Sequence, residues 1–444
     1  MELINRSNKR EESAAKEIVR MLLMAGLILF GTHSSIFSLV AFVLGCFIIV
    51  TESQIKSLEM LMFLAPMATI FKLSPNSLAF LTYLELFYVL FYFIRGRGKI
   101  EKSEMLIFLF GFYLLTIQII NGGIDLNATL KMLANLFLLS VAIKTEVEGE
   151  AKRLFIIFIL GVIISSLMAN ITSSYFHITQ FVGMKGYGTG AGGYVYRFSG
   201  LYRDPNYYSV NVIIALCSII LLLKRKKISA LAAGFFSILL IAFAVETVSK
   251  SAIIMLAVPA IMFLYSMLRE RRYGLFSIGV IAVAIILMLA FSNQIPALDN
   301  IMRRFMSAGT DLDSLTTHRS TLWQNYLHYL SDHIGALLFG RSLLNYTLNG
   351  AAPHNTYLDL LYQLGIVGST FLFAVLALMF KKQRVNFNRN ILNYSIAICI
   401  AIMYLFLSEL QYYDLPFHFI LCYFALNLKT EDEGESYEYA LLDF

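Results

Sequence analysis

Two arginines precede a predicted helix start within residues 197–209. Pro205 suits the first turn of a helix and Asp204 suits the cap before it, so Arg197 and Arg203 are expected just above the helix N-terminus. An anion bound there would meet backbone N–H groups as well as two guanidinium groups. The alternative is that both arginines contact lipid phosphates while neighbouring tyrosines form an interfacial belt.

A further cation lies in the short turn formed by residues 246–251. Lys250 opens the helix that follows, where a positive charge is unfavourable against the helix dipole unless an anion binds there or Glu246 pairs with it. Both interpretations, a ligand-binding lysine and an internal ion pair, are compatible with the sequence.

Residues 318–334 show apolar side chains at helical spacing, namely Leu322, Trp323, Tyr326, Leu327, Leu330 and Ile334. This spacing predicts an amphipathic helix on the membrane surface. Arg319, at its start, would then lie at the depth of a lipid-linked phosphate. A surface helix without any catalytic role is the alternative.

His354 and Asn355 precede a long apolar run that contains Gly365 and Gly368. The pair is expected at the mouth of a membrane span, and the glycines would let another helix approach closely below it. An imidazole beside arginines can stay neutral and act as a base. A histidine that merely occupies the interface is the alternative.

The elements that position these residues must be membrane helices. Hydrophobic residues make up 58% and charged residues 14% of the 444, and the mean hydropathy is +0.70, a balance typical of polytopic membrane proteins. Four cysteines lie in apolar runs without metal-ligand spacing, the sequence contains neither a Walker nor an HExxH motif, and we expect no nucleotide-sugar site of the DxD type. We therefore expect no metal, no cofactor and no nucleic-acid partner.

Apolar windows long enough to cross the hydrocarbon predict about 12 to 14 transmembrane helices. The windows are residues 18–31, 36–50, 58–73, 78–94, 105–120, 128–143, 154–169, 207–223, 228–245, 251–267, 275–291, 356–380, 391–407 and 417–428. The first is expected to be retained rather than cleaved as a signal peptide. The sequence thus predicts one integral membrane domain over residues 1–444.

Lys and Arg residues fall in alternate connections, which predicts that both termini are cytoplasmic. Two long loops, residues 170–206 and 292–355, then face outward and would together form one active site on the outer face of the cytoplasmic (inner) membrane. The tail, residues 429–444, is acidic and is predicted to be cytoplasmic.

Four motifs follow one another between residues 197 and 368. They comprise Arg197, Gly200, Pro205 and Asn206; then Ser249, Lys250, Ser251 and Ala252; then Arg319 and Trp323; and finally Pro353, His354, Asn355, Gly365, Ile366 and Gly368. Their order and spacing resemble the O-antigen ligase and repeat-unit polymerase (Wzy) superfamily, from about the seventh span to the thirteenth. One departure is Lys250, where many relatives carry Arg, and this argues against bidentate binding at that position.

The resemblance implies a GT-C-like, metal-independent glycosyltransferase whose donor is an oligosaccharide linked to undecaprenyl diphosphate. Membrane lipids and a chain-length regulator protein are the other expected partners, and the product would be O-antigen, capsule or exopolysaccharide. A single displacement would invert the anomeric carbon. Polymerase is the favoured function, and ligase of the same superfamily is the alternative.

On this interpretation His354, Arg319 and Arg197 are the catalytic residues. His354 would be the general base, and the arginines would bind the diphosphate and stabilise it as the leaving group. Residues expected to contact the diphosphate or sugars are Arg203, Lys250, Asn206, Asn355 and Tyr202.

A lipid-linked oligosaccharide flippase is the rival from another class, because it would share the span number and the substrate. A flippase needs a charged central cavity. Glu85 is the main carboxylate near mid-membrane, where it would be either a structural partner of Lys131 or a transport residue. The polar residues otherwise concentrate in the outer loops, which favours the enzyme.

Overall fold

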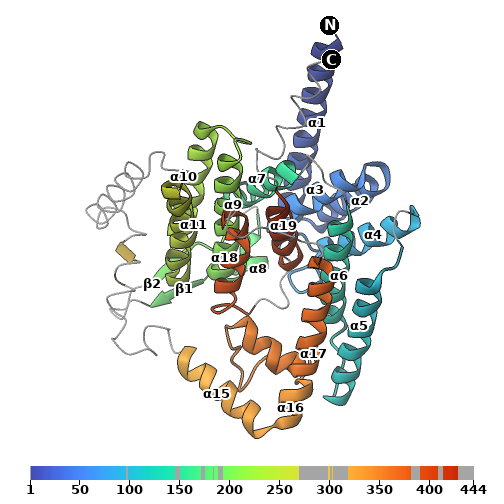
Figure 1. Cartoon of the computed structure of the whole chain (residues 1–444), viewed down its shortest axis with the longest axis vertical. Coiled ribbons are helices and arrows are strands. Elements are labelled where there is room, and N and C mark those ends of the chain that lie inside the picture. Colours follow the sequence, from blue (N-terminus) through green and yellow to red (C-terminus); the bar gives the residue numbers. More distant parts are fainter. Residues whose placement is uncertain are drawn as a thin grey trace.

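The chain forms a bundle of helices with one small β-hairpin (Figure 1). The computed structural model describes residues 2–96, 99–145, 151–171, 176–183, 185–188, 194–269, 299–300, 303, 319–381, 391–408 and 414–428. Of the predicted segments, the window 275–291, the tail 429–444 and the first part of the long loop, apart from residues 299, 300 and 303, lie outside the described residues.

The first part of the chain contains α1 (Glu2–Gly31), α2 (Ser35–Thr51), α3 (Gln54–Leu64), η1 (Ala65–Met67), α4 (Phe80–Ile94), α5 (Lys102–Ile120), α6 (Leu126–Lys144) and α7 (Ala151–Ala169). The middle part contains α8 (Ile178–Val182), β1 (Lys185–Gly188), β2 (Tyr194–Arg197), α9 (Pro205–Lys224), α10 (Ala230–Glu246) and α11 (Lys250–Arg269). The last part contains α15 (Arg319–Asp332), α16 (Ile334–Phe339), α17 (Thr356–Phe380), η3 (Ile391–Tyr394), α18 (Ser395–Met403) and α19 (Leu415–Asn427).

The helices confirm the prediction of an all-helical, polytopic membrane protein. Within the described residues, five helices (α5, α6, α7, α9 and α17) are long and apolar enough to cross a membrane, and six more are apolar but shorter. The hairpin β1–β2 is a small departure from the all-α expectation, with Lys185 opposite Arg197 in an antiparallel register.

The window 58–73 is not one continuous span. Helix α3 ends at Leu64, a 3-10 turn containing Pro66 follows, and residues 68–79 are irregular. A proline cannot donate the backbone hydrogen bond that a helix interior requires, which is the physical reason for the break. The irregular segment brings Lys72 and Pro75 close to the start of α9.

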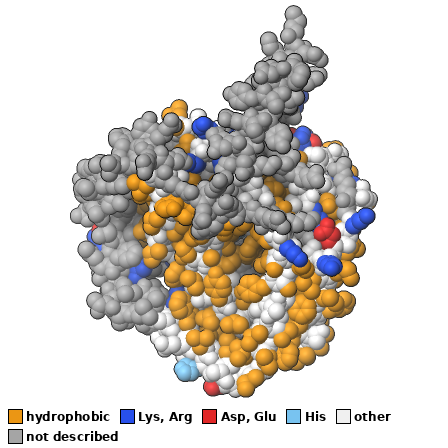
Figure 2. Space-filling model, in the orientation of Figure 1, with side chains coloured by type: hydrophobic (Ala, Val, Ile, Leu, Met, Phe, Trp, Pro, Cys, Tyr) orange, Lys and Arg blue, Asp and Glu red, His pale blue; other side chains and the backbone are white. Residues whose placement is uncertain are grey.

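Helix α9 lies at the centre of the bundle. Of its apolar window 83% is buried, against 44% for α5 and α17, and it packs on α7, α10, α11 and α18. Figure 2 shows a broad face of hydrophobic side chains, with charged side chains mostly along its upper and right-hand margins. This pattern is the one expected of a protein surrounded by lipid, where apolar side chains need no cover from water.

The two ends of the bundle differ in their chemistry. Near α1 and α3, Lys56 lies 2.6 Å from Glu17, and Arg153 pairs with both Glu17 and Glu59. The opposite end carries α15, α16 and the first part of α17 (Figure 1), and we call it the loop end. The 319–355 segment, which carries several of the predicted site residues, lies at this end.

Candidate functional site at the loop end

The start of α9 has the capped geometry that the sequence predicts. Asp204 accepts a hydrogen bond from the backbone N–H of Asn206 (2.8 Å), and Pro205 occupies the first turn. Strand β2 ends at Arg197, whose Nη2 donates to Asn206 Oδ1 (3.2 Å) and whose Nε donates to the Thr247 carbonyl (3.0 Å). Arg197 is therefore held in place over the N-terminus of α9.

The turn between α10 and α11 meets the same asparagine. Ser249 Oγ donates to Asn206 Oδ1 (2.6 Å), and Ser251 Oγ lies 3.4 Å from the same oxygen. Lys250, the first residue of α11, stands between these two serines. Asn206 thus joins the first predicted motif to the second, and Arg197 lies beside both.

Arg203 contacts a different set of neighbours. It is exposed, and it donates to the carbonyls of Pro75 (3.0 Å) and Phe181 (3.3 Å). Lys72 lies within electrostatic reach of it. Burial lowers the pKa of the Lys72 ammonium to about 8, and repulsion by Arg203 and Lys131 adds to this lowering. Lys72 is a cation near the site that sequence reasoning missed.

Tyr202 lies below the surface, with only 2% of its area exposed. Its hydroxyl faces the buried carboxyl group of Asp414. The amide of Asn211 donates to the same carboxyl (2.7 Å), and His418 Nε2 lies 3.1 Å from Asn211 Oδ1. Tyr202 therefore connects the start of α9 to α19 through a buried polar cluster, and its predicted contact with substrate stays a prediction.

The predicted amphipathic helix exists as α15, and its buried face packs on α17 through Tyr326, Leu330 and Tyr362. Trp323 Nε1 donates to the Pro353 carbonyl (2.9 Å), and the Tyr326 hydroxyl donates to the Ala351 carbonyl (2.7 Å). Two side chains of α15 therefore fix the turn that carries His354.

His354 is exposed and has a backbone φ of +48°, which is uncommon for a residue with a side chain. Asn355 caps α17, since its Oδ1 accepts from the N–H groups of Tyr357 (3.0 Å) and Leu358 (3.1 Å). Because that oxygen is committed to the cap, contact of Asn355 with a ligand would have to use the amide nitrogen. A strained backbone like that of His354 is often found at functional sites.

Residues 404–408, which follow α18, contact all of these parts. Arg319 Nη1 donates to the Phe406 carbonyl (2.8 Å). The Thr356 N–H donates to the Tyr404 carbonyl (2.7 Å), and the Tyr207 hydroxyl donates to the Ser408 carbonyl (2.6 Å). The 404–408 segment therefore joins the start of α9, the start of α15 and the start of α17.

Helix α17 is broken at Gly365, where φ is +68° and ψ is −178°. A Cβ at Gly365 would overlap the backbone of Leu338 and Gly340, and one at Gly368 would overlap the ring of Tyr113. The predicted close approach at both glycines is confirmed. The Tyr113 hydroxyl lies 2.6 Å from the Leu364 carbonyl, which becomes accessible because the break interrupts the helix.

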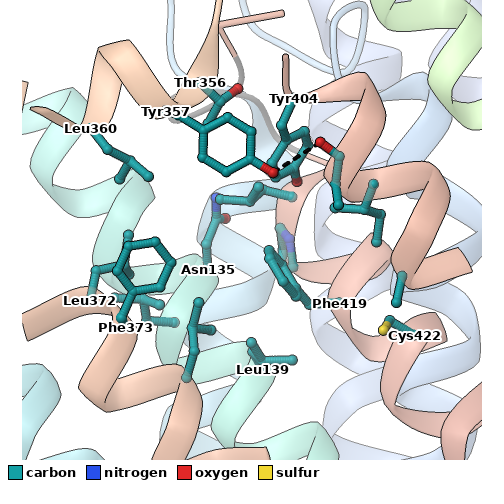
Figure 3. Close-up of a pocket in the computed structure, with 17 residues that line it drawn as sticks. Asn135, Leu139, Thr356, Tyr357, Leu360, Leu372, Phe373, Tyr404, Phe419 and Cys422 are labelled. Atoms are coloured by element: carbon teal, nitrogen blue, oxygen red, sulfur yellow. Dashed lines mark hydrogen bonds between the residues drawn. The ribbon is translucent and has the colours of Figure 1, made fainter. Parts of the chain in front are cut away.

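An apolar cavity of about 250 Å³ lies next to the start of α17 (Figure 3). Its walls come from α6, α17, α18 and α19, and the rings of Tyr357, Phe373, Tyr404 and Phe419 form part of them. The Tyr357 hydroxyl donates to the Ala401 carbonyl (2.9 Å). A cavity with such walls suits hydrocarbon rather than water.

The structure therefore brings Arg197, Asn206 and the Lys250 turn into one group, and Arg319, His354 and Asn355 into another. The 404–408 segment connects the two groups. Glu85 is buried, with Lys131 and Asp414 among its neighbours, and both interpretations of Glu85, a structural partner of Lys131 or a transport residue, stay predictions. Asp359 is buried one turn into α17 and accepts a hydrogen bond from the Gln363 amide (3.1 Å). It is another residue near the His354 turn that the sequence did not indicate.

These features define a polytopic membrane protein, helical apart from one small hairpin, with arginines and an exposed histidine near the starts of α9, α15 and α17. Residues 235–373, about a third of the chain, match the family model described as O-antigen ligase (Wzy_C). The match confirms the resemblance to the O-antigen ligase and polymerase superfamily. Its range includes Lys250, Arg319 and His354, whereas Arg197 and Arg203 precede it. Searches of curated proteins and of solved structures gave no significant match.

Proposed function

We propose that the protein is a polysaccharide repeat-unit polymerase. It would join undecaprenyl-diphosphate-linked oligosaccharides on the outer face of the cytoplasmic membrane. The observation that carries the proposal is the 404–408 segment, which ties Arg319 and the His354 turn to the start of α9, where Arg197 and Arg203 lie. In this proposal, cations from the two distant loops border one region beside an exposed imidazole.

The donor diphosphate is the ligand that this arrangement suits best. Guanidinium groups bind phosphate oxygens through paired hydrogen bonds, and the positive end of the α9 helix dipole adds to the attraction. Arg197 is oriented by Asn206 and Thr247, and Arg319 by Phe406, so both guanidinium groups are partly preorganised. Preorganised positive charge stabilises negative charge that grows on a leaving group.

The reaction is a single displacement at the anomeric carbon of the donor. The acceptor hydroxyl oxygen forms a bond to that carbon while the bond from the carbon to the diphosphate oxygen breaks. The electron pair of the broken bond remains on the diphosphate, and His354 accepts the hydroxyl proton. The products are the lengthened chain on the acceptor and free undecaprenyl diphosphate.

The apolar cavity beside Thr356 supports a lipid-linked donor. Its hydrocarbon walls begin within one turn of His354, so a polyprenyl chain could enter it while the diphosphate stays at the cations. The mean hydropathy and the exposed apolar face support a protein embedded in the bilayer, where such a substrate would lie.

Alanine substitution tests the assignment in cells that make the polymer. His354→Ala should lower the rate by about a hundredfold to ten-thousandfold, the usual range for a lost general base. Arg319→Ala should lower it by about a hundredfold to a thousandfold, the range for a lost electrostatic stabiliser. Single lipid-linked repeats should accumulate in both variants. Normal long chains from either variant would overturn the assignment.

Purified lipid-linked repeats, supplied alone to the reconstituted protein, separate polymerase from ligase. A polymerase builds a ladder of chain lengths from these repeats, because they serve as both donor and acceptor. A ligase produces no ladder until a lipid A core or protein acceptor is added. A flippase would move the repeats across the membrane without lengthening them.

A further inference from the structure

A second groove at the loop end is separate from the cation groups described above. It lies where α5, α15, α16 and the part of α17 that follows the break at Gly365 meet. Its volume is about 700 Å³. Its walls are Tyr113, Thr116, Ile117, Ile120, Asn121, Tyr329, His333, Gly335, Ala336, Phe339, Gly340, Arg341 and Val367. None of these is among the predicted site residues.

Arg341 supplies a positive charge to this groove. Its backbone N–H donates to the Tyr362 carbonyl (2.7 Å), which fixes it against the broken helix α17. The guanidinium of Arg341 is half-buried and lies next to the Tyr362 hydroxyl, and no ion pair with a carboxylate is found for it in the described part of the chain. A guanidinium that lines a groove without a carboxylate partner suits a phosphate ligand, which it binds through charge-assisted hydrogen bonds.

Rings and an amide lie along the same groove. Tyr329 and His333 stack with centroids 4.2 Å apart and planes inclined by 15°. Asn121, at the end of α5, donates to the Ile117 carbonyl and keeps its amide oxygen for other partners. Flat rings next to an amide suit sugar faces and hydroxyl groups, and a plain phospholipid headgroup needs neither.

Apolar side chains continue the groove toward the surface of the bundle. Ile120 is 72% exposed and Phe339 is 48% exposed, and both line the groove. Exposed apolar groups beside a half-buried cation fit a ligand with a hydrocarbon chain and a phosphate.

Helix α15 connects this groove to the His354 turn. It begins at Arg319, holds the Pro353 carbonyl through Trp323, and reaches the groove at Tyr329. Ten residues of helix separate Arg319 from Tyr329, a rise of about 15 Å. An oligosaccharide anchored in the groove could therefore extend along α15 toward His354.

We propose that this groove binds the acceptor, a second polyprenyl-diphosphate-linked oligosaccharide, and this inference rests on the proposed polymerase function. Arg341 contacts the acceptor's phosphate, and the apolar walls receive the first part of its chain. Tyr329, His333 and Asn121 hold the sugars, so that the distal hydroxyl reaches His354. The acceptor keeps its own diphosphate bond, while the donor loses its diphosphate at the arginines of the first site.

Binding stoichiometry tests the inference with the full chain in lipid nanodiscs and radiolabelled undecaprenyl diphosphate as the probe. The unaltered protein should bind two molecules of probe. Arg341→Gln should bind one, and Arg319→Gln should lose the other. Arg303→Gln, an exposed arginine paired with Asp299 (2.8 Å), is the matched control and should bind two.

Each outcome separates the two claims. In one outcome, the unaltered protein binds only one molecule, which Arg319→Gln loses and Arg341→Gln retains. That result would overturn the acceptor site and leave the proposed function standing. No binding at all would overturn both. Displacement of the Arg341-dependent molecule by phosphatidylglycerol at equal concentration would identify the groove as a phospholipid site and overturn the inference.

A second variant examines the sugar contacts without removing the cation. Tyr329→Leu combined with His333→Ala should leave the binding of the sugar-free probe unchanged. With lipid-linked repeats it should raise the KM of chain extension at least tenfold while kcat changes by less than threefold. An unchanged KM would overturn the assignment of these rings to the acceptor.

Discussion

Replacing Asn206 by aspartate tests where the donor diphosphate binds. The amide oxygen of Asn206 lies 3.2 Å from Arg197 Nη2 and accepts from Ser249 at 2.6 Å, and a carboxylate keeps both contacts. The position is in the first turn of α9, where a negative charge favours the helix by about 0.3–1 kcal/mol. Asn206→Asp should therefore fold normally, and its effect should fall on the anion.

The size of that effect follows from Coulomb's law. A phosphate on the far edge of the Arg197 guanidinium would lie about 6 Å from the new carboxylate, and two unit charges at that distance repel by about 3 kcal/mol at an effective dielectric constant of about 20. With partial screening by salt we expect about 2–3 kcal/mol, a rise in Kd of about 30- to 150-fold. Asn206→Ala adds no charge and should raise Kd tenfold at most.

Binding of radiolabelled undecaprenyl diphosphate to the protein in nanodiscs measures this directly. The difference between Asn206→Asp and Asn206→Ala should shrink as the salt concentration rises, because screening weakens the added repulsion. Equal affinity of Asn206→Asp and the unaltered protein at low salt would refute the placement of the diphosphate beside Arg197.

Three further predictions concern the supports of the site. Trp323→Phe removes the hydrogen bond to the Pro353 carbonyl, worth about 0.5–1.5 kcal/mol, and should lower kcat about three- to tenfold with KM unchanged in the polymerisation assay. Gly365→Ala should destabilise the protein by at least about 1–3 kcal/mol, because its backbone conformation is nearly restricted to glycine, and should lower the thermal midpoint, whereas Gly335→Ala, with open space around its Cβ, should not. The third concerns pH: because the pKa of Lys72 is lowered to about 8, its positive charge is lost as pH rises from 7 to 9, so donor affinity should fall over that interval, and Lys72→Met should remove that part of the pH dependence. A midpoint unchanged by Gly365→Ala, a kcat unchanged by Trp323→Phe, or the same pH profile with and without Lys72 would contradict the respective argument.

Local rules predicted several parts of the site correctly. The cap at Asp204, the helix over Arg319–Asp332 and the close approach at Gly365 each depend on neighbours in sequence or on a single helical period, whereas the membrane-surface location of that helix stays a prediction. Such features can be predicted because the responsible residue types, a capping carboxylate, a repeating apolar face and a glycine, are visible in the sequence.

The contacts that assemble the site could not be predicted in the same way. Arg319, Thr356 and Tyr207 meet backbone carbonyls of the 404–408 segment, and a carbonyl has no residue signature. Lys72 was hidden inside an apolar window, although Pro66 could have indicated that the helix ends before it. The hairpin β1–β2 was missed because a Gly- and Tyr-rich run does not show the alternation of a half-buried strand.

The central claim is that two loops far apart in sequence form one diphosphate site. A cryo-EM structure of the full chain in a nanodisc with undecaprenyl diphosphate tests it most directly. We predict that the diphosphate contacts Arg197 and Arg319 together, with its chain entering the cavity beside Thr356 and His354 facing the bound phosphates. A diphosphate that contacts the arginine of only one loop, or neither, would contradict the account.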